Sequence, residues 1–297
     1  MRRFLKKTLF FLLLPVLILT VAYSLFAYYV NNTSTAYYLE PNVSTIYIGD
    51  SHIQKAINDN IIPNSINLGQ PSESLYFSYF KLRMFLQHNP SIKQVYLGVG
   101  YHNISEYYDQ FIYGDLSASV TPKYFHLLPA SKQAKLLFLS GKNITPFMKS
   151  IINEGVKIIY PDTNGLNFKG KYQNLYVKKT KAVDSSMNKR IQHQYYDNNR
   201  LYPFSELNLY YLDQIKKLCE SKNVKLTALN TPLHDYYKNK IPKVYQEKLL
   251  EILSKSKIDY LDLSELKLNE NCYIPDGDHV SELGAKIVSI YLKSMSD

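Results

Sequence analysis

Short apolar runs alternate along the chain with longer segments whose apolar residues recur at helical spacing. The runs are rich in β-branched and aromatic residues, which is typical of buried strands. They cover residues 45–48, 66–68, 95–99, 224–229 and 258–263. The intervening segments predict helices over residues 75–87, 207–219, 244–253 and 283–292. This alternation predicts an α/β domain of three layers, with helices on both faces of a parallel sheet and ligand chemistry at the carboxyl ends of the strands.

Residues 101–200 interrupt the alternation. They are rich in Tyr, Asn and Lys, and only residues 156–160 resemble a strand, while residues 130–139 and 146–153 have helical spacing. A structureless loop of this length is uncommon inside a compact domain. We therefore predict one domain over residues 44–297, with an insertion at about 105–200 that has some structure of its own.

The N-terminal residues have the composition of a membrane anchor. Residues 8–30 carry no charge and follow the basic residues Arg2, Arg3, Lys6 and Lys7. As a helix they would span about 34 Å, enough to cross a hydrocarbon core of about 30 Å. Basic flanks stay on the cytoplasmic side. The sequence thus predicts a single-pass transmembrane helix within residues 1–30, a linker over 31–43 and an extracytoplasmic domain; a cleaved signal peptide is the alternative.

Charge and cysteine content narrow the function classes. The chain carries 35 basic and 25 acidic residues, a net charge of +10, with a basic run over residues 169–190. Such a run is usually a solvated surface, so nucleic acid is not a predicted partner; binding of a polyanion is the alternative. Two cysteines, Cys219 and Cys272, exclude a disulfide scaffold and a four-thiolate zinc site. No pair of possible ligands shows a compelling metal spacing, and no cofactor is predicted.

Candidate chemistry begins where the first strand ends, at Gly49-Asp50-Ser51. A serine between a strand and a helix places its hydroxyl at the carboxyl edge of the sheet, close to helical N–H donors. Ser51 is therefore a candidate nucleophile. The alternative is a helix N-cap with no chemical role.

An acid and a histidine lie near the other end of the chain, three residues apart. Asp276 and His279 stand just before the last predicted helix. A serine nucleophile needs a base to accept its proton, and the base needs an acid to fix its tautomer. The alternative is a solvated turn, in which Asp276 and Asp278 are favoured by local hydrogen bonds.

Taken together, four short motifs resemble the conserved blocks of the SGNH, or GDSL-type, hydrolase superfamily. In chain order they are Gly49-Asp50-Ser51, Asn67-Leu68-Gly69, Gly100-Tyr101-His102-Asn103 and Asp276-x-x-His279. The resemblance implies a flavodoxin-like sheet and acyl transfer at a serine. Two departures are His52 after the serine and the absence of an acid after Asn103; the glycine that opens the third block is either Gly98 or Gly100.

The resemblance assigns roles to individual residues. Ser51 is the nucleophile, His279 the general base and Asp276 its orienting acid. The oxyanion hole consists of the N–H groups of Ser51 and Gly69 and the side-chain amide of Asn103.

Two further histidines could contact substrate. His102 lies beside Asn103, and His234 follows the strand predicted at residues 224–229. A packed or solvated histidine is the alternative for both.

An N-terminal anchor joined to an SGNH-like domain resembles accessory proteins of cell-surface polymer O-acylation. This implies an extracytoplasmic esterase or O-acyltransferase acting on acyl esters, acetyl above all, of a surface glycan. The implied partners are the lipid bilayer, the acylated polymer and a membrane acyltransferase. The alternative is a membrane-tethered binding or assembly component without turnover. Water as acceptor makes an esterase, and a sugar hydroxyl makes a transferase.

Overall fold

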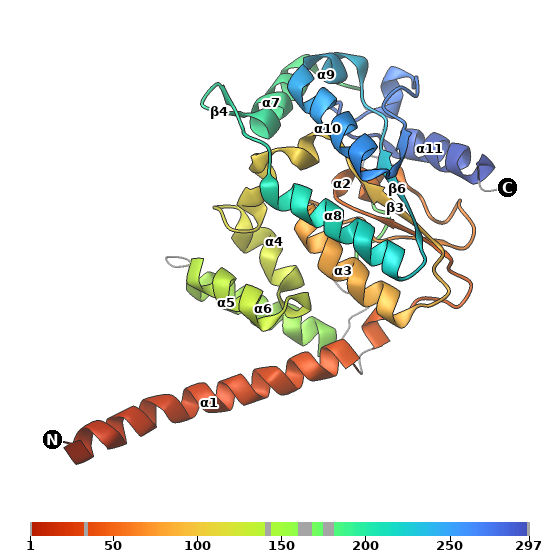
Figure 1. The fold of residues 1–297 in the computed structure, drawn as a ribbon. Helices are drawn as coiled ribbons and strands as arrows, with labels where there is room; N and C mark the ends of the chain where they lie inside the picture. The colour runs from red at the N-terminus through yellow and green to blue at the C-terminus, as the bar shows by residue number, and fades with distance from the viewer. Residues whose placement is uncertain (1, 33–34, 140–143, 160–167, 175–180, 296–297) are drawn as a thin grey trace.

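The computed structural model describes residues 2–32, 35–139, 144–159, 168–174 and 181–295 (Figure 1). Its main sheet has the strand order β2-β1-β3-β6-β7, and every neighbouring pair is parallel. The strands are β1 (Thr45–Ile48), β2 (Ser65–Asn67), β3 (Gln94–Gly98), β6 (Lys225–Asn230) and β7 (Asp259–Asp262). The predicted parallel α/β fold is therefore confirmed, and its strand order is the flavodoxin-like one.

Helices cover both faces of this sheet because consecutive strand residues point to opposite sides. Ile46 and Ile48 belong to a core shared with α3, α8 and α10, whereas Tyr47 belongs to a second core shared with α2 and α11. The helices are α2 (Ser51–Ala56), α3 (Leu75–His88), α8 (Glu206–Ser221), α9 (Asp235–Lys240), α10 (Lys243–Ser256) and α11 (Glu282–Ser294). The three predicted layers are present.

The insertion is largely helical in its described part. It contains α4 (Ser117–Tyr124), α5 (Ala130–Leu139), α6 (Ile144–Ile159), α7 (Asp184–Tyr195) and a short hairpin of β4 (Tyr196–Asp197) and β5 (Arg200–Leu201). The strand predicted at residues 156–160 is wrong, since residues 156–159 are the last turn of α6 and residue 160 lies outside the described residues. Val156 continues the helical spacing of Phe147, Met148 and Ile152, and this period outweighs its β propensity.

A buried polar cluster ties the insertion to the sheet. The Lys81 ammonium and the Glu73 carboxylate are both fully buried and form an ion pair. Glu73 also accepts hydrogen bonds from the hydroxyls of Ser78 and, in the insertion, Tyr124, each at 2.7 Å. Burial raises the pKa of Glu73 and lowers that of Lys81. The ring of Tyr124 stacks on Phe77 with centroids 4.5 Å apart, so packing and hydrogen bonding fix the same contact.

The first helix, α1 (Arg2–Asn32), projects from the domain (Figure 1). Its C-terminal part packs against the insertion, where the rings of Tyr23 and Phe125 lie 6.2 Å apart. Closer to the N-terminus, Phe4, Phe10 and Phe11 are exposed. Among the described residues, no helix combines the length and the hydrophobicity that a membrane crossing requires. This finding does not support the transmembrane helix predicted within residues 1–30.

Candidate active site

The turn between β1 and α2 presents Ser51 at the carboxyl edge of the sheet. Gly49 has φ +150°, and a Cβ at this position would lie 3.0 Å from Ile53 Cγ1 and 3.1 Å from Gly98 Cα, closer than side chains ordinarily pack. A glycine is therefore required for the chain to turn here. Asp50 caps α2 by accepting the N–H of His52 at 2.9 Å, so that Ser51 becomes the first helical residue.

The structure brings the three predicted triad residues together from the two ends of the domain. Ser51 Oγ lies 2.8 Å from His279 Nε2, and Asp276 Oδ2 lies 2.8 Å from His279 Nδ1. Asp276 also accepts the backbone N–H of His279 at 3.2 Å. Gly277 allows this arrangement because its φ of +67° turns the loop between Asp276 and the histidine. The spacing matches a serine, base and acid relay.

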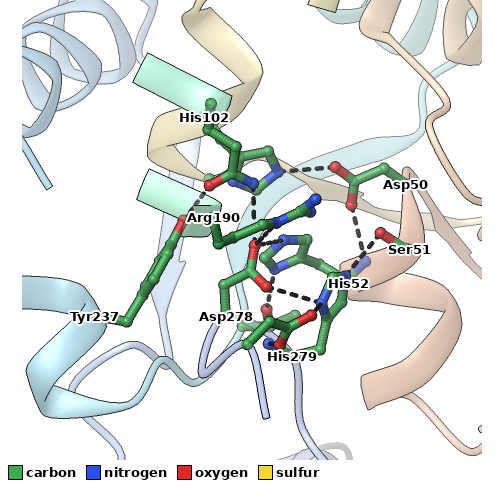
Figure 2. Close-up of polar contacts among 12 residues, drawn as sticks. Asp50, Ser51, His52, His102, Arg190, Tyr237, Asp278 and His279 are labelled. Carbon is green, nitrogen blue, oxygen red and sulfur yellow. Dashed lines mark hydrogen bonds and ion pairs between the residues drawn. The ribbon is translucent and has the colours of Figure 1, made fainter. Parts of the chain in front are cut away.

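The environment of His279 favours its protonated form. Burial lowers the pKa of this imidazole, but the carboxylates of Asp278 and Asp276 raise it, and the net direction is upward. Asp278 was considered from the sequence only as a turn residue. In the structure it is fully buried, and its Oδ1 also lies 2.8 Å from His279 Nδ1 (Figure 2).

A second buried carboxylate, that of Asp50, organises the other side of the site. Its Oδ2 accepts hydrogen bonds from His102 Nε2 at 2.8 Å, Tyr108 OH at 2.7 Å and Asn103 Nδ2 at 3.0 Å. Burial opposes ionisation, yet the neighbouring imidazoles of His52 and His102 hold the pKa of Asp50 well below its ordinary value. Asp50 therefore fixes the third sequence block beside Ser51.

Three imidazole rings form a stack across the site. The ring of His52 lies 4.2 Å from that of His102 and 4.5 Å from that of His279, measured between centroids (Figure 2). Burial lowers the pKa of His52 to about 4, with His102 contributing in the same direction. His52 is accordingly neutral at pH 7 and packs against the base without adding charge.

Two of the three predicted oxyanion donors already make hydrogen bonds within the protein. The Gly69 N–H donates to Asn67 Oδ1 at 2.7 Å, because the Asn67 side chain folds back over the turn. In this arrangement Gly69 does not supply the predicted donor, which corrects that prediction. Asn103 uses one amide hydrogen for Asp50, and an amide nitrogen has two. The Ser51 N–H lies in the first turn of α2, where N–H groups lack intrahelical acceptors.

The two histidines predicted to contact substrate occupy supporting positions. His102 is buried and bonded to Asp50. His234 caps α9 and pairs through Nε2 with Glu270 Oε1 at 2.9 Å. Its backbone N–H donates to the carbonyl of Gly277 at 2.9 Å, which supports the triad loop. Contact of either side chain with substrate stays a prediction.

Possible metal ligands meet in two groups within the described residues. They are Asp50, His52 and His102, and His52, Asp278 and His279. The sequence predicted neither group because the ligands come from separate blocks. In both groups the carboxylate already has protein donors: His102, Asn103 and Tyr108 on Asp50, and Arg190 and Gln194 on Asp278. We assign no metal to either group.

Sequence reasoning missed the contribution of α7 to this site. Arg190 Nε lies 2.8 Å from Asp278 Oδ2 (Figure 2). Gln194 Nε2 lies 3.0 Å from the same oxygen. The basic run that contains Arg190 was expected to be a solvated surface, which is wrong for this residue. The available signal was the spacing of Met187, Ile191 and Tyr195, which are all buried and mark the inner face of α7.

Comparisons with known proteins give structural likeness only. No protein-family model and no curated protein matches the chain. A GDSL-like lipase from Bacteroides thetaiotaomicron is similar at 11% identity and a TM-score of 0.42, over 91% of this chain and 97% of its own. A proposed acylhydrolase from Bacteroides fragilis is similar at 11% identity and a TM-score of 0.39, over 85% of each chain. Likeness at this level does not define an activity, so function must be argued from the site.

Proposed function

We propose that the protein is a serine ester hydrolase or O-acyltransferase. One observation carries the proposal: Ser51 Oγ, His279 and Asp276 form a continuous hydrogen-bonded chain with two contacts of 2.8 Å. The raised pKa of His279 makes it an effective proton acceptor. These hydrogen-bonded residues therefore include the base that a serine nucleophile needs.

The reaction proceeds in two acyl-transfer steps. Ser51 Oγ bonds to the ester carbonyl carbon while its proton passes to His279 Nε2, and that proton then goes to the leaving alcohol as the ester bond breaks. Water or a sugar hydroxyl next attacks the acyl-serine, giving its proton to His279 and releasing the acid or a new ester. Asp276 holds the imidazole in the required tautomer throughout.

Negative charge on the carbonyl oxygen would be stabilised by two groups near Ser51. The Ser51 N–H and the second amide hydrogen of Asn103 have no recorded acceptor among the described residues. Loss of one such donor typically costs about 100- to 1000-fold in rate. With Gly69 bonded to Asn67, this hole is smaller than the sequence predicted.

A surface glycan is the acceptor or substrate that we propose. An open pocket of about 720 Å³ beside α7 is lined by Tyr107, Tyr196 and Tyr202 together with several amide side chains. Tyrosine rings and amides suit the apolar faces and hydroxyl edges of sugars. Ser51, Asp276 and His279 are not among its lining residues, but Tyr107 directly precedes Tyr108, which bonds to Asp50. An extracytoplasmic location is part of the same proposal and rests on the charge pattern of residues 2–30.

A serine-directed fluorophosphonate tests the proposal directly. We expect labelling of Ser51 and hydrolysis of 4-nitrophenyl acetate, with both lost in Ser51→Ala. Ser185→Ala, at an exposed serine of α7, is the matched control and should behave like the wild type. Mass spectrometry of the digested protein identifies the labelled peptide. Equal labelling of the wild type and Ser51→Ala would contradict the proposal.

The occupied Gly69 N–H favours a second candidate, a binding component that retains the fold without turnover. Such a protein would lack the oxyanion stabilisation that activates both esters and fluorophosphonates. It would give neither labelling nor ester hydrolysis while remaining folded. The same experiment therefore separates the two candidates, with a cooperative thermal unfolding transition as the check on folding.

A further inference from the structure

Two carboxylates, not one, lie at the same nitrogen of His279. Asp276 Oδ2 and Asp278 Oδ1 are each 2.8 Å from Nδ1. Asp276 is 26% exposed and accepts the hydrogen bond, whereas Asp278 is 0% exposed and its Oδ1 has no hydrogen-bond partner among the described residues. Because Nδ1 carries a single proton and Asp276 receives it, Asp278 acts on the imidazole through its charge.

The charge of Asp278 is maintained from the insertion. Ionising a buried carboxylate costs several kcal/mol, because its charge is removed from water. Arg190 Nε, 2.8 Å from Asp278 Oδ2, compensates this cost, and Gln194 adds a hydrogen bond to the same oxygen. Gln194 is held in turn by the hydroxyl of Tyr237 from α9. Burial alone would raise the pKa of Asp278, but Arg190 and His279 hold it well below its ordinary value.

We infer that the buried Asp278 and the half-buried Arg190 form a charge pair that positions His279 and sets the charge around it, so that the insertion helix α7 is a working part of the esterase site. The inference rests on the proposed function and adds two positioning residues to it. Other charged or titratable groups facing His279 are Asp276 from the same loop and His52 and Lys55 from α2. Of these, His52 is neutral at pH 7 and Asp276 is partly solvated, so the Asp278–Arg190 pair dominates the buried side of the ring.

Opposite charge removals should move the titration of His279 in opposite directions. Asp278→Asn removes a negative neighbour and should lower the pKa of His279 by about one unit, whereas Arg190→Gln should raise it. The direct readout is the ¹³C-labelled histidine NMR titration, assigned with His279→Gln. The acid limb of kcat/KM for 4-nitrophenyl acetate should follow, because the base acts only when neutral. A purely structural role would not move the two titrations oppositely.

Redundancy of the two acids gives a second test. Removing the sole acid of a serine triad costs about 10⁴-fold in kcat. With Asp278 still beside Nδ1, we expect Asp276→Asn to lose only about 10-fold, and Asp276→Asn combined with Asp278→Asn to lose about 10⁴-fold. Equal losses in Asp276→Asn alone and in the double variant would overturn the role of Asp278.

Control variants test whether a shift in the His279 pKa comes from the Asp278–Arg190 pair or from misfolding or a general change of charge. Arg190→Lys retains the positive charge and should keep the wild-type titration, and Lys181→Gln removes an exposed charge just before α7 and should change nothing. If a single variant fails to fold, Asp278→Asn combined with Arg190→Gln leaves no unpaired buried charge. Its His279 pKa should still fall, because Asp278 is the nearer group.

The outcome of the NMR titration is independent of turnover. An unchanged His279 pKa in the folded variants overturns the inference even where ester hydrolysis is intact. Absent hydrolysis and labelling in the wild type, together with the expected titration shifts, would instead overturn the proposed function and leave the charge pair established.

Discussion

At the residue scale, Asp50 joins local structure to the site. One oxygen of its carboxylate caps α2 and sets Ser51 as the first helical residue, while the other receives His102, Asn103 and Tyr108. An ionised carboxylate is stable in the interior when several donors bond to it, and Asp50 has four. The same side chain thus begins the helix that carries Ser51 and positions the third sequence block against it.

Substitution of the nucleophile and the base should show that they act as a unit. Ser51→Ala and His279→Ala should each abolish hydrolysis of 4-nitrophenyl acetate, and the double variant should be little slower than either single one, since the relay of 2.8 Å contacts is already broken by one change. Steady-state kcat/KM of the three proteins decides this. Multiplicative losses would contradict a shared relay.

The sequence predicted residues that the structure brings together, Ser51, Asp276 and His279, but not the hydrogen bonds of the residues around them. Gly69 and Asn103 fall in the expected blocks, yet the Gly69 N–H meets Asn67 Oδ1 and the Asn103 amide meets Asp50. The first contact depends on a side chain that folds back across a turn, and the second joins residues that are 53 positions apart in the sequence. Such contacts leave no periodic signal in a sequence. The Gly69 N–H was therefore predicted as an oxyanion donor, although the Asn67 side chain already accepts its hydrogen bond.

At the scale of elements, prediction succeeded where burial imposes a period. The strands and the helices α3, α8, α10 and α11 lie within a few residues of their predicted bounds because each packs an apolar face on the sheet. The helix α7 was not predicted, since its sequence is mostly polar and its inner face also carries Arg190 and Gln194. A partner distant in sequence, Asp278, holds Gln194 in the interior and Arg190 half-buried.

The buried cluster between α3 and α4 gives a stability prediction at this scale. Lys81→Met leaves the Glu73 carboxylate buried without its cation and should reduce the free energy of unfolding by about 3–5 kcal/mol. Combining Lys81→Met with Glu73→Gln removes both charges and should recover much of that loss. Guanidinium denaturation measures both. Lys216→Met, on the half-exposed α8 pair with Glu220, is the control and should cost less than about 1 kcal/mol.

At the scale of the whole molecule, the chain divides into a body built around the sheet and a projecting helix (Figure 1). The insertion contacts both: Tyr124 reaches the Glu73 cluster and Phe125 packs on Tyr23 of α1. Through Arg190 the same insertion reaches Asp278, in the loop that carries His279. The insertion thus lies between α1 and the loop that carries His279. Although its sequence shows little hydrophobic periodicity, it makes contacts with α1, with the body around the sheet and with that loop.

Placement of the domain outside the cytoplasm stays a prediction, based on basic residues at the N-terminus followed by the uncharged residues 8–30. We expect protease added to the outer face of intact cells or spheroplasts to digest the chain beyond residue 31 while a cytoplasmic marker survives. The exposed rings of Phe4, Phe10 and Phe11 would then lie in an apolar environment. Replacing the three by serine should release the chain from the membrane fraction, and replacing the exposed Phe138 of α5 should not. A strictly cytoplasmic reporter that is active when fused after Asp297 would show the opposite location.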